Sequence, residues 1–119
     1  MDDTLVLRYR KVRLITGKSR LNLISKMIDI MLENENKRTI YACTNKNEKG
    51  LSELMDMLGV DLKEIKLKKN IKIIYGNLPV EVLEKEKPEI LLIDTDQAFV
   101  QIEKVIHMNK CKIYITQPL

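Results

Sequence analysis

Two short segments of the sequence carry residue types that suit phosphate chemistry. Residues 17–19 read Gly-Lys-Ser and lie between an apolar, strand-like stretch and a helix-like one. A lysine and the backbone N–H groups at a helix start attract phosphate, and a neighbouring hydroxyl can bind Mg²⁺. Asp94 directly follows the apolar residues 90–93, where a carboxylate can organise a metal ion. The candidate phosphate, nucleotide and metal ligands from these segments are therefore Gly17, Lys18, Ser19 and Asp94.

A second candidate site is a basic segment near the N-terminus. Arg8, Arg10, Lys11 and Arg13 surround Tyr9, a pattern that could contact a nucleic-acid backbone. The plainer interpretation, which we favour, is a solvated face or an exposed edge strand that charge protects from self-pairing. The net charge of +4 permits an acidic partner without requiring one. With four Tyr, one Phe and no Trp, a base-stacking surface is not expected.

The remaining reactive residues do not indicate a site. Two cysteines, Cys43 and Cys111, and one histidine, His107, cannot form a four-ligand zinc centre by themselves. We expect both cysteines to be buried small hydrophobes, and Asp96 to be a helix N-cap. The sequence contains neither an apolar run of the ~20 residues that a membrane helix needs nor a signal-peptide pattern. It therefore predicts a cytoplasmic protein without membrane contact.

The elements that must position these residues alternate along the chain. Short apolar stretches predict five strands, and amphipathic stretches with capping residues predict four helices. A further segment, residues 61–69, is ambiguous. The strands are expected at residues 12–16, 39–43, 71–75, 89–94 and 112–116, and the helices at residues 19–34, 48–58, 79–86 and 97–109.

This alternation predicts an α/β fold of three layers. Crossover helices imply a mainly parallel five-stranded sheet that is covered on both faces, with right-handed connections. The composition, 45% hydrophobic and 32% charged, is that of a globular domain. We predict one domain over residues 1–119, in which residues 1–11 form an extra edge strand or are loosely attached.

With these motifs in this order, the chain resembles the RecA-like ATPase core, particularly that of DnaB-type replicative helicases. Residues 17–24 are similar to the end of the family's P-loop (Walker A) motif and its following helix, and residues 90–94 to a Walker B strand. Residues 113–117 look like the family's strand that ends in Thr-Gln. The resemblance implies that Gln117 senses a γ-phosphate or DNA, and it covers about residues 12–119.

The resemblance also implies an order for the strands. The RecA-like order 5-1-4-3-2 is favoured over the flavodoxin-like order 2-1-3-4-5. The favoured order would place the strand ending in Asp94 beside the Gly17 loop, with Gln117 on the other side of that loop.

The sequence departs from the family pattern at two places. The family has a glycine five residues before the glycine of its Gly-Lys-Ser/Thr tail, where this sequence has Val12. The family's catalytic glutamate follows the second strand, where this sequence has no carboxylate before Glu48. An attacking water would therefore lack an evident base. These departures predict a RecA-like domain that has lost hydrolysis, and they favour a protein that is not an enzyme over a minimal ATPase.

Three functions follow from these observations. The first is a non-hydrolysing binding or accessory module in DNA replication, recombination or mobile-element biology. It would bind a protein partner, associate with itself or contact nucleic acid. The second is a minimal ATPase that binds ATP and Mg²⁺ through the candidate ligands and Gln117. The third is a receiver- or flavodoxin-like regulatory domain, although residues 16–17, Thr-Gly, lack the acidic pair of a receiver.

Overall fold

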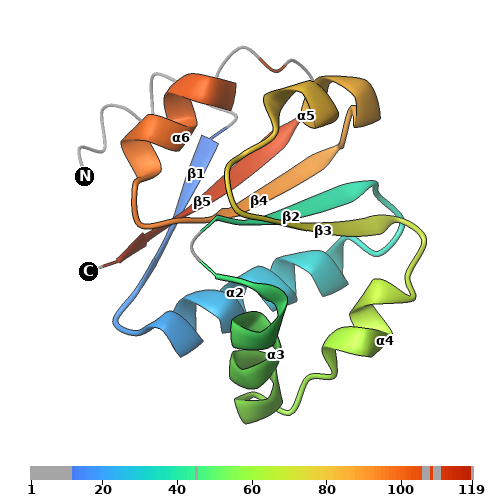
Figure 1. The fold of residues 1–119 in the computed structure, drawn as a ribbon, viewed down its shortest axis with the longest axis vertical. Coiled ribbons are helices and arrows are strands. Elements are labelled where there is room, and N and C mark those ends of the chain that lie inside the picture. Colours follow the sequence, from blue (N-terminus) through green and yellow to red (C-terminus); the bar gives the residue numbers. More distant parts are fainter. Residues whose placement is uncertain (1–11, 45, 106–107, 109–110, 119) are drawn as a thin grey trace.

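The computed structural model describes residues 12–44, 46–105, 108 and 111–118, and they form an α/β domain (Figure 1). The expected strands and helices are all present. The ambiguous segment forms one more short helix, α4. In chain order the elements are β1 (Val12–Gly17), α2 (Arg20–Glu33), β2 (Thr39–Cys43), α3 (Glu48–Met57), α4 (Leu62–Lys66), β3 (Ile71–Tyr75), α5 (Val80–Glu86), β4 (Ile90–Asp94), α6 (Ala98–Val105) and β5 (Lys112–Pro118).

The five strands form one sheet in the order β1-β5-β4-β2-β3, and every neighbouring pair is parallel. The predicted α/β class and five-stranded parallel sheet are confirmed. The order is consistent with a RecA-like arrangement, but it differs from the predicted 5-1-4-3-2 and from the flavodoxin-like alternative. Contrary to the prediction, β5 separates β1 from β4, so the Gly17 junction and Asp94 are one strand apart. Residues 1–11, the predicted extra edge strand, lie outside the described residues.

The strands differ in how far they are buried. β2 and β4 are buried along their whole length, whereas β1 and β3 expose Arg13 and Lys72. A charged side chain inside a strand is tolerated at an edge, where one side of the strand faces solvent. The predicted order placed β2 at an edge, whereas the structure places this fully buried strand inside the sheet, between β4 and β3.

The helices cover the sheet according to the direction in which the chain crosses it. From β1 through β2 to β3 the chain moves one way, and α2, α3 and α4 lie on one face (Figure 1). From β3 through β4 to β5 it returns, and α5 and α6 lie on the other face. Because crossovers are right-handed, reversing direction moves the helices to the opposite face. The reversal creates a switch point at the carboxyl ends of β2 and β4, whose following helices lie on opposite faces.

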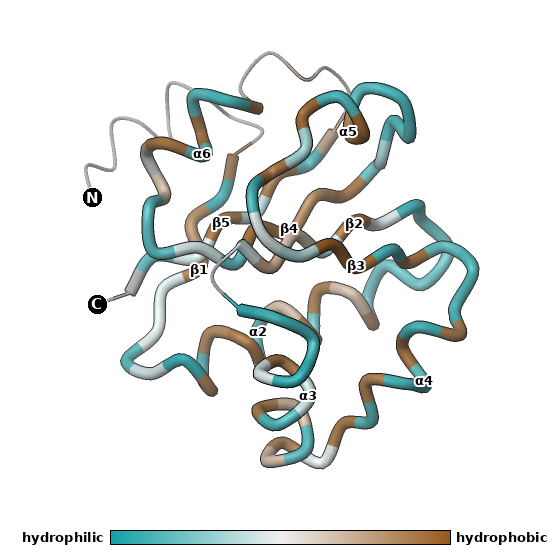
Figure 2. Tube along the Cα trace, in the orientation of Figure 1, coloured by the Kyte–Doolittle hydropathy of each residue, from teal (hydrophilic) through white to brown (hydrophobic). Residues whose placement is uncertain are grey.

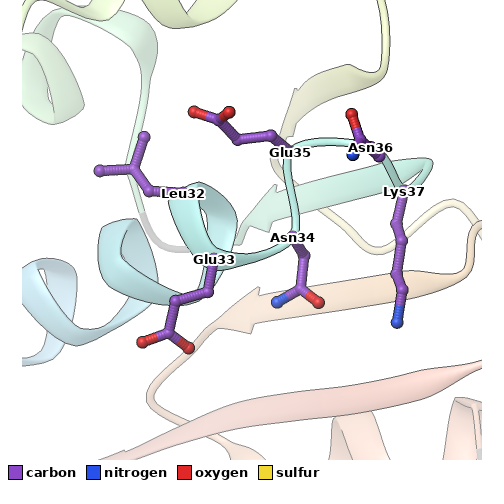
Figure 3. Close-up of a pocket in the computed structure, with 6 residues that line it drawn as sticks. All are labelled: Leu32, Glu33, Asn34, Glu35, Asn36 and Lys37. Carbon is purple, nitrogen blue, oxygen red and sulfur yellow. The ribbon is translucent and has the colours of Figure 1, made fainter.

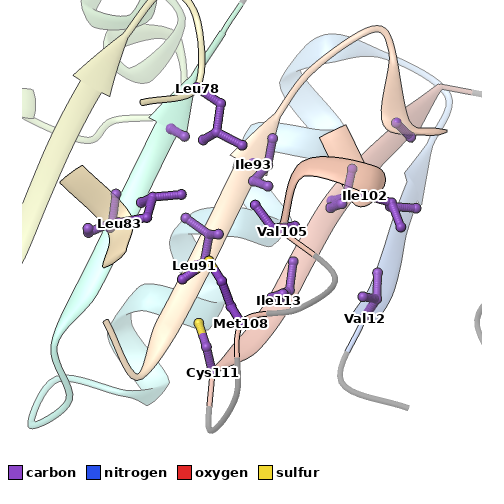
Figure 4. Close-up of a cluster of buried hydrophobic side chains, with 14 residues drawn as sticks. Val12, Leu78, Leu83, Leu91, Ile93, Ile102, Val105, Met108, Cys111 and Ile113 are labelled. Carbon is purple, nitrogen blue, oxygen red and sulfur yellow. The ribbon is translucent and has the colours of Figure 1, made fainter. Parts of the chain in front are cut away.

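Two hydrophobic cores result, one on each face of the sheet. Alternate residues of a strand point to opposite faces, so Leu91 and Ile93 pack with α5 and α6, whereas Ile90 and Leu92 pack beneath α2, α3 and α4. Figure 4 shows the first core, and Figure 2 shows hydrophobic residues concentrated along the strands. By the same alternation, Asp94 points toward the face covered by α2.

Candidate functional site

The β1–α2 junction is the first part of the predicted site. The chain passes from Gly17 to Arg20 with only two residues between strand and helix. The Ser19 side chain accepts a hydrogen bond from the Asn22 N–H at 3.1 Å, so this hydroxyl is the N-cap of α2. Lys18 is exposed. A Cβ on Gly17 would lie 2.4 Å from Asn22 Oδ1, so the Asn22 side chain already occupies the space over the junction.

Asp94, the second part, is completely buried at the carboxyl end of β4. Its Oδ1 accepts a hydrogen bond from Arg20 Nη1 at 2.5 Å, and its Oδ2 accepts one from the Tyr41 hydroxyl at 3.3 Å. Cys43 Sγ lies 4.0 Å from the same Oδ2. Tyr41 and Cys43 lie on β2, next to β4, and point to the face covered by α2 as Asp94 does. The carboxylate is therefore held by groups of the chain itself.

Arg20 bridges two carboxylates. Its second nitrogen, Nη2, pairs with Asp96, whose side chain is 60% exposed. The Asp96 carboxylate pairs with Arg20, and Thr95 Oγ1 accepts a hydrogen bond from the Gln97 N–H at 3.0 Å. That Asp96 also caps α6 stays a prediction. The first residue of α2 thereby ties the helix start to the carboxyl end of β4.

The pKa values of the groups around Asp94 reflect burial. Desolvation is the main cause that raises the pKa of Asp94, while Arg20, the Tyr41 hydrogen bond and Lys46 lower it in part. Desolvation and then the Asp94 charge raise the pKa of Cys43 to about 12. The same two causes raise the pKa of Tyr41 well above its ordinary value. Both groups are therefore neutral at physiological pH, and the Tyr41 hydroxyl keeps its proton and donates a hydrogen bond to the Asp94 carboxylate.

The loop after β4 is fixed to β5 by a buried hydroxyl. Thr116 Oγ1 accepts from the Thr95 N–H and donates to the Thr95 carbonyl, at 2.9 Å in both cases. Gln117 follows on β5 and is half-buried, between the ends of β1 and β4. The structure thus brings Asp94 and Gln117 to the same end of the sheet as Lys18 and Ser19, the end at which the strands have their carboxyl termini.

The other candidates are placed as follows. Arg13 is exposed on β1, while Arg8, Arg10, Lys11 and His107 lie outside the described residues. Cys43 and Cys111 are both buried, as expected. Within the described part of the chain, no group of three or more His, Cys, Asp or Glu side chains could hold a metal ion. No helix in that part is both long and apolar enough to span a bilayer.

Sequence reasoning missed the role of Arg20. The notable signal was an arginine directly after a helix N-cap, combined with two carboxylates that follow a buried strand. It also missed Tyr41, although residues 41 and 94 would be recognised as near neighbours once the β2–β4 pairing is known.

A hollow of about 330 Å³ at the α2–β2 turn is distant from these residues (Figure 3). Six consecutive residues line it, from Leu32 to Lys37, and all but Asn34 are exposed. The hollow lies at the start of β2, at the opposite end of the sheet from Asp94. It brings no residues from separate parts of the chain together, so we do not assign it a site.

Comparison with solved structures confirms the fold. The chain is similar to the crystal structure of the KaiC-like protein PH0186 from the hyperthermophilic archaeon Pyrococcus horikoshii OT3, with a TM-score of 0.63 and 13% identity. The similarity covers 91% of this chain and 62% of that one. No protein-family profile and no curated protein match the sequence. The protein therefore has a RecA-like α/β fold, and it spans less than two thirds of the length of this neighbour.

Proposed function

We propose that this protein is a RecA-like domain that has lost ATP hydrolysis and acts as a binding or accessory module. The observation that carries the proposal is the state of Asp94. In a nucleotide-hydrolysing P-loop protein, the aspartate at this strand end helps to hold Mg²⁺. Here the carboxylate is fully buried, and both its oxygens accept hydrogen bonds, from Arg20 and Tyr41.

The other residues of the predicted nucleotide site do not fit a magnesium nucleotide either. A P-loop needs a run of free N–H groups to surround the phosphates. Only two residues separate β1 from α2, and the Asn22 N–H is bonded by Ser19. The Ser19 oxygen, a candidate Mg²⁺ ligand, is used in this cap. Arg20 supplies a fixed positive charge next to Asp94, which repels a divalent cation.

The process in which the module acts is proposed from the resemblance to DnaB-type helicases. This resemblance favours DNA replication, recombination or mobile-element biology, with a protein partner or a second copy as the binding target. The N-terminal residues Arg8, Arg10 and Lys11, together with Arg13, are the candidate nucleic-acid contact. Neutralising them would reduce the salt dependence of any DNA binding.

Thermal unfolding with and without ATP or ADP and Mg²⁺ tests the proposal. A nucleotide at ~100 times its Kd would add about 2.7 kcal/mol to the free energy of unfolding, a rise in Tm of several degrees. We expect no rise at millimolar nucleotide.

The matched control is Lys18→Ala, which removes the exposed candidate phosphate ligand. A rise in the wild type that disappears in Lys18→Ala would support the alternative, a minimal ATP- and Mg²⁺-binding domain, and would refute the proposal. Arg20→Met is measured in parallel, because it removes the positive charge beside Asp94. A rise in Tm with nucleotide and Mg²⁺ that occurs only in Arg20→Met would show that Arg20 prevents the nucleotide from binding.

A further inference from the structure

We infer that a pocket at the switch point of the sheet binds a small, uncharged polar molecule through Gln101. The pocket lies outside the carboxyl ends of β2 and β4, where the following helices leave on opposite faces of the sheet. In open α/β sheets, ligands bind in the crevice at such a point. The volume is about 200 Å³, below that of typical drug-sized sites. The lining residues are Thr44, Asn77, Thr95, Asp96, Gln97 and Gln101.

Gln101 is the residue that identifies the pocket as a site. Its side chain lies on α6, only 7% of the residue is exposed, and its Oε1 is buried without a hydrogen-bond partner among the described residues. A buried polar atom that lacks a partner costs about 1–3 kcal/mol relative to one that has it. The molecule that enters the pocket can supply the missing donor.

The charges of the lining indicate which ligands are suited. Among the described residues, the lining consists of five uncharged polar side chains and one carboxylate, that of Asp96, and includes no lysine or arginine. A phosphate or carboxylate ligand would therefore lie beside the Asp96 carboxylate, whose own cationic partner, Arg20, does not line the pocket. The lining thus differs in charge from the predicted nucleotide site, which contains Lys18. It favours a neutral ligand that donates hydrogen bonds.

The carboxamide of Gln101 narrows the ligand class further. It carries an acceptor oxygen and a donor nitrogen side by side, so it pairs with a ligand edge that has a donor next to an acceptor. Adenine and cytosine present such an edge, and glutamine is a known partner of adenine. A primary carboxamide, such as that of nicotinamide, presents the same edge.

A ligand in this pocket would also contact the Arg20 bridge. Asp96 lines the pocket and pairs with Arg20, which in turn pairs with the buried Asp94. Occupation of the pocket would thus be transmitted to the β1–α2 junction. Neither the pocket nor this connection depends on the proposed loss of hydrolysis.

The test is an NMR titration of the ¹⁵N-labelled full chain with adenine, cytosine and nicotinamide, one at a time, up to about 5 mM. We expect saturable shifts for at least one of them, at the Gln101 side-chain amide and at the backbone amides of Thr44, Thr95 and Gln97. The three arms distinguish a base edge from a carboxamide. Absence of saturable shifts with all three compounds would overturn the inference.

Gln101→Met is the decisive variant, because it keeps the length of the side chain and removes both hydrogen-bonding atoms. We expect at least a tenfold loss of affinity, while Tm is unchanged or higher because a buried atom without a partner is gone. The matched control is Glu103→Met, an exposed position on the same helix, with affinity within about twofold of the wild type. Equal affinity in Gln101→Met and the wild type would overturn the inference. If Gln101→Met does not fold, Gln101→Glu replaces it, and nicotinamide, whose carbonyl needs the lost donor, should bind more weakly.

Discussion

Replacing Arg20 by methionine should destabilise the domain far more than replacing an ordinary surface arginine. Asp94 is fully buried, so the substitution leaves a buried carboxylate whose remaining side-chain donors among the described residues are the Tyr41 hydroxyl and the weaker Cys43 thiol. Removing one partner of a buried ion pair costs about 3–5 kcal/mol. The Arg20 side chain is 23% exposed, so water already reaches the pair. We therefore expect the substitution to lower the free energy of unfolding by about 2–3 kcal/mol at neutral pH. For a domain of this size, that loss lowers Tm by about 10 °C.

The destabilisation should also depend on pH. Burial raises the pKa of Asp94 in the folded state, so the stability that this group contributes is complete below its unfolded pKa and declines as pH rises through the folded pKa. Arg20 opposes the rise in this pKa. In Arg20→Met the folded pKa moves further upward, and stability continues to fall over a wider range of pH. The difference between variant and wild type should therefore be larger at about pH 7 than at about pH 4.

Urea unfolding at several pH values measures this difference. The matched control is Arg38→Met, whose pair with Glu89 is exposed and 3.6 Å long, and whose loss should cost less than about 1 kcal/mol. Adding Asp94→Asn to Arg20→Met should recover part of the stability, because the buried charge is then absent. If Arg20→Met lost no more stability than Arg38→Met, or if its loss did not depend on pH, Arg20 would not be the group that neutralises Asp94.

Three further predictions concern the same edge of the sheet. Thr116→Val should lower the free energy of unfolding by about 1–3 kcal/mol, because the buried N–H and carbonyl of Thr95 lose their partner. Thr116→Ser keeps the hydroxyl and should retain most of this free energy. An equal loss in both variants would contradict the role of the hydroxyl. Gly17→Ala should destabilise by about 1 kcal/mol through overlap with Asn22 Oδ1, and adding Asn22→Ala should relieve part of this cost, which urea unfolding would show. Cys43, with its pKa raised to about 12, should react with a thiol reagent at pH 8 only as fast as the domain unfolds. Peptide mass spectrometry after timed labelling measures the rate of this reaction. Rapid labelling of the folded protein would disprove the burial of Cys43.

The sequence was sufficient to predict the elements and the two faces of the sheet. The apolar residues of β4 alternate between two cores, as a central parallel strand requires, and Ser19 and Pro79 are found at helix starts. Hydrophobic periodicity is a local property, and so it specifies strands and helices well. It does not specify which strands are neighbours, because β2, β4 and β5 are all largely apolar.

The candidate site could be predicted only in part for the same reason. Lys18, Ser19, Asp94 and Gln117 do lie at one edge of the sheet, as strand ends in a parallel sheet must. The Arg20–Asp94 pair joins residues 74 positions apart, and an arginine at a helix start is ordinarily solvated. Its partner becomes evident only when the packing of α2 over β4 is known. Gln101 gave no sequence signal, because a single amide on an amphipathic helix is usually exposed.

The central claim, that Asp94 serves the chain's own arginine rather than a magnesium nucleotide, is tested most directly by measuring phosphate release from Mg²⁺-ATP by the purified chain. We predict a rate equal to that of Lys18→Ala and of buffer alone. Release by the wild type that is clearly faster than that of Lys18→Ala, and that is lost in Asp94→Asn, would contradict the account and establish a working ATPase.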